Sequence, residues 1–379
     1  MHILYLSAPG GGLETNVRVL APALIAEGHQ VSLLYLHTAA EPQPRPSGAN
    51  DIPTYHATIG DLHYYASRAT FGKSSLARVI RSLEAARALT QVVKMIHQQH
   101  PIDLIELPEF ALAFQRLPAP FIVRLHAAAW ILRTVLAEGY SVADAIEKRL
   151  EGETLRRAAA ISSPSRMLAD LVRRECELAT PIEIIPYPVD TQRFCPAPKD
   201  SARKRALFVG RVEARKGADV LLQVIPQILA RHSNAEFWFA GRISDELRAL
   251  VAAAPAQVKF LGIVPHAELI PLYQQAAIVV VPSLWDNSPN VIYEAMACGT
   301  PVIATCVGGI PELVEHGVTG WLVPPRDVKA LGEAISQLLC DSSRLARMAE
   351  KTRAKAVNEF AVEQICSQTL ALYERAIQA

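Results

Sequence analysis

Two carboxylates, Asp286 and Glu294, are separated by seven residues and are candidates for chemistry. Asp286 lies in a polar turn after an apolar run, and Glu294 lies just inside a helix expected to begin near Asn290. A carboxylate in the first turns of a helix is favoured by the helix dipole and can accept two hydrogen bonds from a vicinal diol. The backbone amides of Asn290 and Val291 can hold hydroxyls or an anion. The pattern indicates a diol site, or simply an acidic helix start without a ligand.

Two cations follow a second apolar run, in the segment FVGRVEARKGADVLL (208–222). The expected strand ends at Gly210, Arg211 follows it directly, and Lys216 precedes the start of the next expected helix. A diphosphate is bound by charge-assisted hydrogen bonds together with amides oriented at a helix start. We therefore expect Arg211 and Lys216 to bind a diphosphate, whereas Arg215 is expected in a solvated basic loop.

A glycine loop, Gly10 to Gly12, follows the first apolar run of the chain. Residues without a Cβ allow a ligand to approach the backbone closely, so the amides of Gly11 and Gly12 are candidate phosphate ligands. The loop contains neither the GxGxxG fingerprint of dinucleotide-binding proteins nor a GxxxxGK[ST] phosphate loop. The glycines are therefore supporting evidence only.

The elements that must position these residues alternate between apolar runs and helical patterns, which predicts two parallel α/β sheets in tandem. Strands are expected over 3–6, 31–36, 102–106, 121–125 and 159–162, and then over 206–209, 236–240, 258–261, 278–281 and 301–304. Helices are expected from about residue 17 to Gly28, and over 74–97, 220–231, 267–276, 290–298 and about 330–358.

Prolines interrupt every regular pattern in IIPYPVDTQRFCPAP (184–198), and we place the domain boundary there. The first domain is expected over 1–188 and the second over 205–359, with a linker at 189–204. A helical period over 360–379 predicts a final helix that crosses back to complete the first domain. The proline segment would act as a hinge that lets the domains close around a ligand and exclude water.

Composition narrows the class of protein. The chain has 379 residues and a formal net charge of +1, which argues against nucleic-acid binding because phosphate neutralisation requires surplus Lys and Arg. Its six cysteines form no CxxC pair, as expected for structural thiols in a reducing compartment. Neither a signal peptide nor an apolar window of membrane-spanning length is present, so a cytoplasmic location is expected.

The segment 68–94 is rich in basic residues interleaved with apolar ones, and contains the single acidic residue Glu84. An amphipathic helix with a solvated basic face is the favoured interpretation. The alternative is a peripheral contact with the inner face of the membrane, because a cationic apolar helix can rest on anionic lipid.

Taken together, the motifs resemble those of the GT-B-fold retaining glycosyltransferases called glycosyl transferases group 1, or family 4. That family carries a GR-x4-KG element and an acidic pair before an AMACG-like segment, here AMACGTPVIAT (295–305). The matching residues of the two elements are Gly210, Arg211, Lys216, Gly217, Asp286 and Glu294. A weaker match is RLHAAAW (124–130), in which His126 resembles a histidine that the family places beside the donor sugar.

The resemblance implies a hexosyltransferase with two Rossmann-like parallel-sheet domains that face each other across a cleft. It would move a sugar from a nucleoside diphosphate sugar to a hydroxyl of a glycan, lipid-linked or small-molecule acceptor, with retained configuration. The implied roles are diphosphate binding by Arg211 and Lys216, ribose binding by Glu294, sugar binding by Asp286 and His126, and backbone contacts from Gly11, Gly12, Gly210, Gly241, Asn290 and Val291.

Two departures from the family pattern concern the identity of the donor. Asp286 stands where the family usually has Glu, and PYPVD (186–190) stands where Asn-Gly often precedes Val-Asp. The chain has no DxD motif, so no metal cofactor is expected, and the departing phosphate itself would take the acceptor proton in a front-face reaction. The alternatives are a catalytically silent regulator that binds nucleotide sugars and a nucleotide-sugar epimerase on the same fold.

Overall fold

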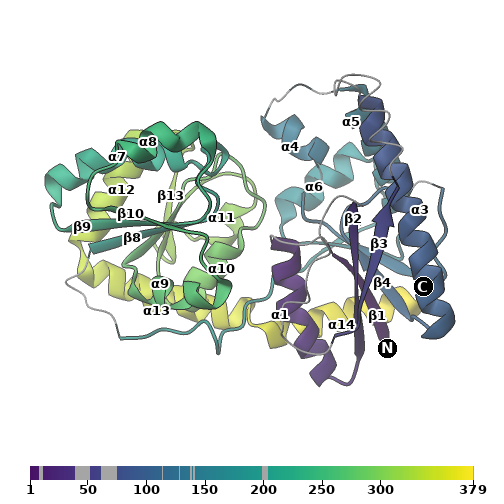
Figure 1. The fold of residues 1–379 in the computed structure, drawn as a ribbon. Coiled ribbons are helices and arrows are strands. Elements are labelled where there is room, and N and C mark those ends of the chain that lie inside the picture. The colour runs from purple at the N-terminus through teal and green to yellow at the C-terminus, as the bar shows by residue number, and fades with distance from the viewer. Residues whose placement is uncertain are drawn as a thin grey trace. The chain divides into compact units, whose positions relative to one another are not determined.

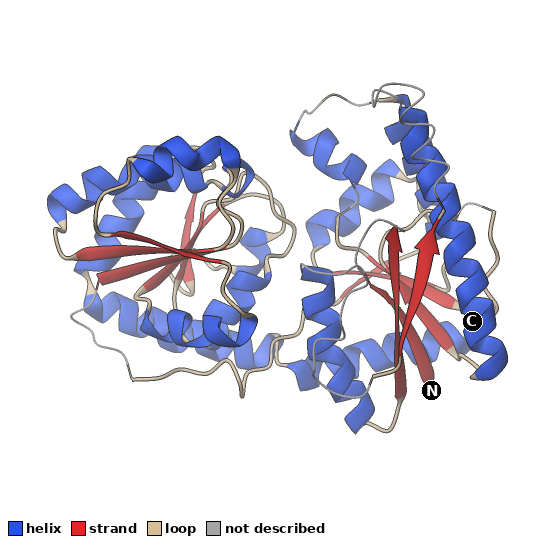
Figure 2. Ribbon diagram, viewed as in Figure 1, coloured by secondary structure: helices blue, strands red, loops and turns tan. Residues whose placement is uncertain are grey.

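The structure, a computed structural model, describes residues 1–7, 12–38, 52–60, 75–112, 114–127, 129–136, 139, 141–198 and 204–378. The chain divides into two compact units, which Figure 1 colours along the sequence. Unit 1 comprises Met1–Pro186 and Ile365–Ala379, and unit 2 comprises Tyr187–Gln364. Each unit is an α/β structure whose strands lie between layers of helices (Figure 2).

Unit 1 contains a parallel sheet of seven described strands in the order β3-β2-β1-β4-β5-β6-β7. Residues of β1, β4 and β5 are buried throughout, which explains why apolar residues dominate these strands without alternating with exposed polar ones; the buried Glu106 and Arg124 are charged exceptions. The strands are β1 (His2–Ser7), β2 (Gln30–Thr38), β3 (Thr54–Ile59), β4 (Leu104–Leu107), β5 (Phe121–Arg124), β6 (Ala160–Ser163) and β7 (Ile182–Ile184).

Helices of unit 1 cover both faces of its sheet (Figure 1). Local residues determine where these helices begin and end. Gly28, at φ +84°, follows the end of α1, and the Ser141 side chain forms a capping box at the start of α5. The helices are α1 (Gly12–Ala26), α3 (Ser75–Gln99), α4 (Ala129–Leu136), α5 (Val142–Arg157) and α6 (Arg166–Glu175).

The last helix, α14 (Val362–Gln378), completes unit 1 from the far end of the chain. Its buried residues, among them Ile365 and Leu372, pack in one core with Ile3, Leu24 and other residues of β1 and α1. Figure 1 shows this yellow helix lying beside the purple β1. A helix that packs on the first domain was the expectation for this segment.

Unit 2 contains a parallel sheet of six described strands in the order β10-β9-β8-β11-β12-β13. The strands are β8 (Lys204–Val209), β9 (Ala235–Ala240), β10 (Val258–Gly262), β11 (Ile278–Val281), β12 (Val302–Thr305) and β13 (Gly320–Val323). Its helices are α7 (Ala218–Arg231), α8 (Arg248–Ala252), α9 (His266–Gln275), α10 (Asn290–Ala297), α11 (Ile310–Leu313), α12 (Val328–Cys340) and α13 (Ser342–Glu359).

Two cores lie on the two faces of this sheet, because successive side chains of a strand point to opposite faces. Phe208 packs with α7 and α12 on one face, whereas its neighbour Leu207 packs with α9 and α10 on the other. Val189 and Phe194 are buried in this second core, so part of the segment expected as a linker, 189–204, packs against unit 2.

In each parallel sheet, the order in which the chain adds strands reverses in the middle. In unit 1, β1 pairs with β2 on one side and β4 on the other, and in unit 2 β8 lies between β9 and β11. Crevices form at such switch points, beyond the carboxyl ends of the strands, and are where ligands bind in open α/β sheets. Lys216 follows β8 and Asp286 follows β11, so these two candidate residues lie at the switch point of unit 2.

Three strands, β3, β7 and β13, were absent from the sequence-based expectation. Among the described strands each lies at an edge of its sheet, and β7 and β13 are only three and four residues long. The expected helix over 330–358 is two helices, because Asp341 ends α12 and its side chain caps α13 through the Arg344 amide. Among the described helices none combines the length and apolarity needed to cross a bilayer.

Candidate active site

Lys216 and Asp286 meet at the switch point of unit 2. Lys216 ends the short 3-10 turn after β8, Asp286 lies in the loop after β11, and Nζ donates to Oδ2 at 2.5 Å. Both side chains keep some exposure, 24% for Lys216 and 15% for Asp286. Because both side chains remain partly open to solvent, the ion pair can separate when a ligand binds. The ammonium can then bind a negative charge of the ligand, and the carboxylate can bind its hydroxyls.

The loops around this pair approach each other closely enough to require glycine. A Cβ on Gly217, at φ +69°, would lie 1.8 Å from the Pro282 carbonyl, and one on Gly308, at φ +56°, would lie 1.8 Å from the Asp286 carbonyl. The Leu284 amide also donates to the Arg215 carbonyl at 2.9 Å. These contacts fix the backbone that presents Lys216 and Asp286.

Arg211 makes a contact of its own, with Glu213. Its guanidinium makes an ion pair with Glu213 at 3.3 Å and is 63% exposed, and Glu213 also pairs with Arg215 at 3.0 Å. Of the two expected phosphate ligands, the structure therefore shows Lys216 in contact with Asp286, whereas Glu294 is held by other partners. Diphosphate binding by Arg211 stays a prediction.

The predicted backbone ligands lie at the carboxyl ends of the strands or at a helix start. Gly210 and Gly241 follow neighbouring strands, and a Cβ on Gly241 would lie 1.9 Å from the Gly210 carbonyl, so the two turns are in contact. Asn290 and Val291 are the first two residues of α10. Their roles toward a ligand remain predictions.

Glu294 is buried on α10, with a side-chain exposure of 8%. Its Oε1 lies 2.8 Å from Nε2 of His266, and its Oε2 accepts a hydrogen bond from the Tyr273 hydroxyl at 2.6 Å. Both partners lie on α9, which sequence reasoning had assigned as a helix without a functional residue. No local pattern marks them, because they precede Glu294 by 28 and 21 positions.

In unit 1, His126 follows β5 and Glu109 follows β4, the neighbouring strand. Glu109 Oε1 accepts the His126 amide at 2.6 Å. Burial and the nearby Arg124 lower the pKa of His126 to about 3, so its ring is neutral at physiological pH. Gly11 lies outside the described residues, and Gly12 is the first residue of α1.

Glu109, which contacts His126, and Glu151, which interacts with Glu109, both have raised pKa values. Burial raises the pKa of Glu109 to about 7, against backbone hydrogen bonds from Glu109, His126 and Ala127 that lower it. Burial likewise raises the pKa of Glu151 to about 8, helped by the charges of Glu109 and Glu147, although Trp130 Nε1 donates to Glu151 at 2.6 Å. Sequence reasoning found neither residue.

The stability of unit 1 is expected to fall as pH rises from about 4.5 toward 8. In that window the folded protein retains protons on Glu109 and Glu151 that the unfolded chain has released, so unfolding becomes more favourable with each increment of pH. Glu151→Gln removes one of these groups, and urea unfolding at pH 5, 6, 7 and 8.5 should show a flatter profile than the parent. Glu153→Gln, on the exposed side of the same helix, should leave the profile unchanged, and parallel profiles for both variants would contradict the assignment.

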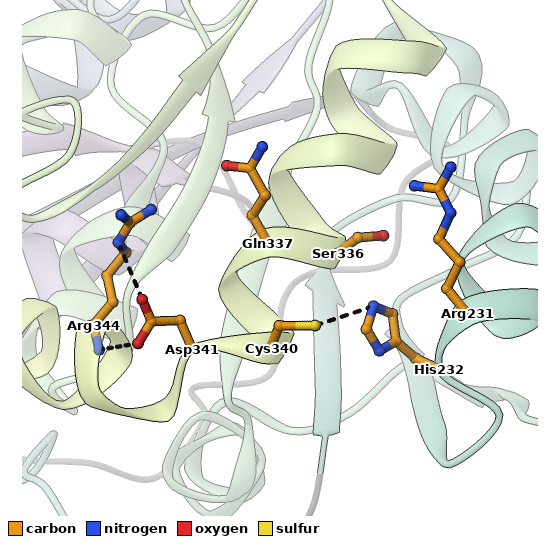
Figure 3. A pocket seen from close by; sticks show the side chains of 7 residues that line it. All are labelled: Arg231, His232, Ser336, Gln337, Cys340, Asp341 and Arg344. Atoms are coloured by element: carbon orange, nitrogen blue, oxygen red, sulfur yellow. Dashed lines mark hydrogen bonds and ion pairs between the residues drawn. The ribbon is translucent and has the colours of Figure 1, made fainter.

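A separate hollow in unit 2, of about 650 Å³, lies between the end of α7 and the junction of α12 with α13 (Figure 3). Figure 3 shows Arg231 and Arg344 at its two ends and His232 beside Cys340, with 3.8 Å between Nε2 and Sγ. The end of α7 leads into the start of β9, so this hollow lies at the amino-terminal ends of the strands. Lys216 and Asp286 lie at the opposite, carboxyl-terminal ends. Within the described residues, no three His, Cys, Asp or Glu side chains are grouped to hold a metal ion.

Known proteins match both parts of this chain. Residues 203–341 match the family model described as glycosyl transferases group 1, and residues 10–193 match glycosyltransferase family 4. D-inositol 3-phosphate glycosyltransferase 1 of Catenulispora acidiphila is 30% identical, over 98% of this chain and 94% of its own. The glycogen synthase of Mycobacterium tuberculosis is 26% identical, over 96% of this chain and 91% of its own.

Solved structures show the same fold. Sucrose-phosphate synthase from Thermosynechococcus elongatus has a TM-score of 0.80 at 25% identity, covering 100% of this chain and 99% of that one. Anabaena HepE in complex with UDP has a TM-score of 0.72 at 20% identity, covering 98% of this chain and 99% of that one. The predicted GT-B fold class and glycosyltransferase class of enzyme are thereby confirmed. The chain belongs to the glycosyl transferases of group 1, family 4.

Proposed function

We propose that the enzyme transfers a hexose from a nucleoside diphosphate sugar to an acceptor hydroxyl, with retention of configuration and without a metal cofactor. The observation that carries the proposal is the Lys216–Asp286 pair at the switch point between β8 and β11. The pair offers a cation for the diphosphate and a carboxylate for sugar hydroxyls within one contact. HepE, which has the same fold, is described in complex with UDP and with UDP-glucose.

Charge governs the proposed reaction. As the glycosidic bond breaks, negative charge grows on the diphosphate, and a fixed ammonium stabilises that charge more in the transition state than in the ground state. Lys216 supplies this group, and Arg211 supplies a second cation once it exchanges Glu213 for the phosphate. Asp286, released from Lys216, accepts hydrogen bonds from the hydroxyls of the donor sugar.

Unit 1 contributes a neutral imidazole in this proposal. His126 orients the donor sugar by hydrogen bonding, and the low pKa of its ring keeps it from adding a positive charge. The departing phosphate oxygen takes the acceptor proton, so no separate carboxylate nucleophile is required. Retention follows because the acceptor attacks from the face that the phosphate leaves.

The basic segment 68–94 is proposed to be a solvated helix face, not a membrane contact. Its residues 68–74 lie outside the described residues. In α3, Arg78 donates to Asp144 at 3.0 Å and also pairs with Glu147 on α5 at 3.7 Å, so it is engaged within unit 1. Arg81, Arg87 and Lys94 remain exposed.

The function is tested with a panel of UDP-, GDP-, ADP- and TDP-sugars, offered with D-inositol 3-phosphate or a glucan as acceptors. These acceptors are chosen because relatives are named for them. We expect one donor to release its nucleoside diphosphate with product of retained anomeric configuration, and the rate to persist in EDTA. Loss of activity in EDTA with recovery on adding manganese would overturn metal independence.

The same panel separates the alternative functions. A silent regulator would bind a nucleotide sugar and release no nucleoside diphosphate. An epimerase would convert the donor sugar without an acceptor and without releasing the nucleotide. Either result would overturn the proposed transfer reaction.

A further inference from the structure

Glu294 is held by two side chains of a neighbouring helix. His266 Nε2 lies 2.8 Å from Oε1, and the Tyr273 hydroxyl lies 2.6 Å from Oε2, so each carboxylate oxygen has one partner from α9. The three side chains differ in exposure: Tyr273 is fully buried, Glu294 is 8% exposed and His266 is 38% exposed. His266 is therefore the member of the cluster that adjoins solvent.

The protons in this cluster can be assigned from chemistry. An ionised carboxylate only accepts hydrogen bonds, so Nε2 of His266 and the Tyr273 hydroxyl must both be donors. Burial, and next the charge of Glu294, raise the pKa of Tyr273 well above its usual value, which keeps its hydroxyl protonated. Each carboxylate oxygen keeps a further lone pair, so Glu294 retains one acceptor site on each of its two neighbouring oxygens.

A pair of adjacent acceptors fits a pair of adjacent hydroxyls. A cis-diol such as the 2′- and 3′-hydroxyls of ribose donates both protons to one carboxylate only if the carboxylate is held in the right orientation. A free glutamate side chain has several rotamers, and fixing them on binding lowers affinity. His266 is itself held, since its ring packs against Phe194 with centroids 5.3 Å apart.

We propose that His266 and Tyr273 are positioning residues that fix the Glu294 carboxylate for the ribose diol, and so set the preference of the enzyme for ribonucleotides over 2′-deoxyribonucleotides. The inference rests on the proposed function, in which Glu294 binds the donor ribose. It predicts a selective effect: loss of either α9 side chain weakens the ribonucleotide and spares the 2′-deoxyribonucleotide, which has one hydroxyl fewer to bind.

The test measures dissociation constants by calorimetry for UDP, GDP and ADP and for their 2′-deoxy counterparts, with the full chain. Wild type is expected to bind the preferred ribonucleotide about tenfold or more tightly than its 2′-deoxy form, as a lost hydrogen bond to a charged group implies. His266→Ala and Tyr273→Phe should each reduce that ratio to about threefold or less. His266→Gln, whose amide can donate to the same oxygen, should keep the wild-type ratio.

Glu268→Gln is the matched control, because Glu268 is an exposed residue in the first turn of the same helix. It should leave the ratio unchanged. If His266→Ala and Tyr273→Phe weaken both nucleotide forms equally, or leave the ratio at its wild-type value, the positioning role is overturned while the proposed function stands. If wild type binds none of these nucleotides, or binds both forms equally, the proposed role of Glu294 fails first.

Discussion

Replacing Lys216 by alanine is expected to lower kcat for sugar transfer by about 10²- to 10³-fold, the loss typical of removing one preorganised group that stabilises charge in the transition state. Lys216 contacts Asp286, and it lies beyond the carboxyl ends of the paired strands β8 and β11. Because the diphosphate gains charge as the sugar leaves, the loss should appear in kcat more than in the affinity for the nucleoside diphosphate sugar.

The neighbouring Arg215→Ala is the control for this prediction. Arg215 is adjacent in sequence and also cationic, but its guanidinium pairs with Glu213 at 3.0 Å and it contributes a carbonyl, not its side chain, to the loop contact with Leu284. Its removal should change kcat by less than about twofold, in line with a partly exposed ion pair. Steady-state kinetics with saturating donor measures both variants, and equal losses would show that general loop charge, not the placement of Lys216, drives the rate.

The order of elements was predictable because strands buried on both faces are plain apolar runs. β1, β8 and β11 could be found in this way, and so could the positions of Gly12, Lys216 and Asp286 just after them. Strands such as β7, three residues long and at a sheet edge, carry too few apolar positions for such a pattern. The sequence therefore predicts which candidate residues lie at strand ends better than it predicts the number of strands.

The partners of the candidate residues were less predictable, for a physical reason. Glu294 could be identified from its motif, but His266 and Tyr273 reach it from another helix, and such contacts leave no periodicity in a single sequence. Glu109 holds the amide of His126 from the adjacent strand end in the same way. Arg211 matched its motif, yet its exposed guanidinium pairs with Glu213, two residues further along the chain.

Replacing Arg124 by leucine is expected to destabilise unit 1 by about 3–5 kcal/mol, because it leaves a buried carboxylate without its counter-charge. Glu106 and Arg124 are each 4% exposed and meet at 2.9 Å between adjacent strands. Arg124 also donates to Thr369 at 3.3 Å, and Tyr373 donates to Glu106 at 2.6 Å. The network thus joins β4 and β5 to α14, the last helix of the chain.

Thermal unfolding of the variant should show this loss as a transition about 10 °C lower for unit 1, given about 2–4 °C per kcal/mol for domains of such size. Urea unfolding should show it as a lower midpoint concentration. Nucleotide binding by unit 2 should persist below that transition. Arg375→Leu on the same helix is the control: its ion pair with Glu183 is 2.6 Å long but about half exposed, so its loss should cost less than about 1 kcal/mol.

A double variant separates unpaired charge from lost packing. Glu106→Leu combined with Arg124→Leu removes both charges and fills the space with apolar side chains, and buried ion pairs replaced in this way often lose little stability. Tyr5 and Tyr373 retain each other as hydrogen-bond partners at 2.5 Å, which limits the polar groups left unsatisfied. We expect the double variant to recover most of the stability that Arg124→Leu loses. If the double variant is as unstable as Arg124→Leu, then packing and hydrogen bonds of the network hold α14. In that case the unpaired charge of Glu106 does not explain the loss of stability.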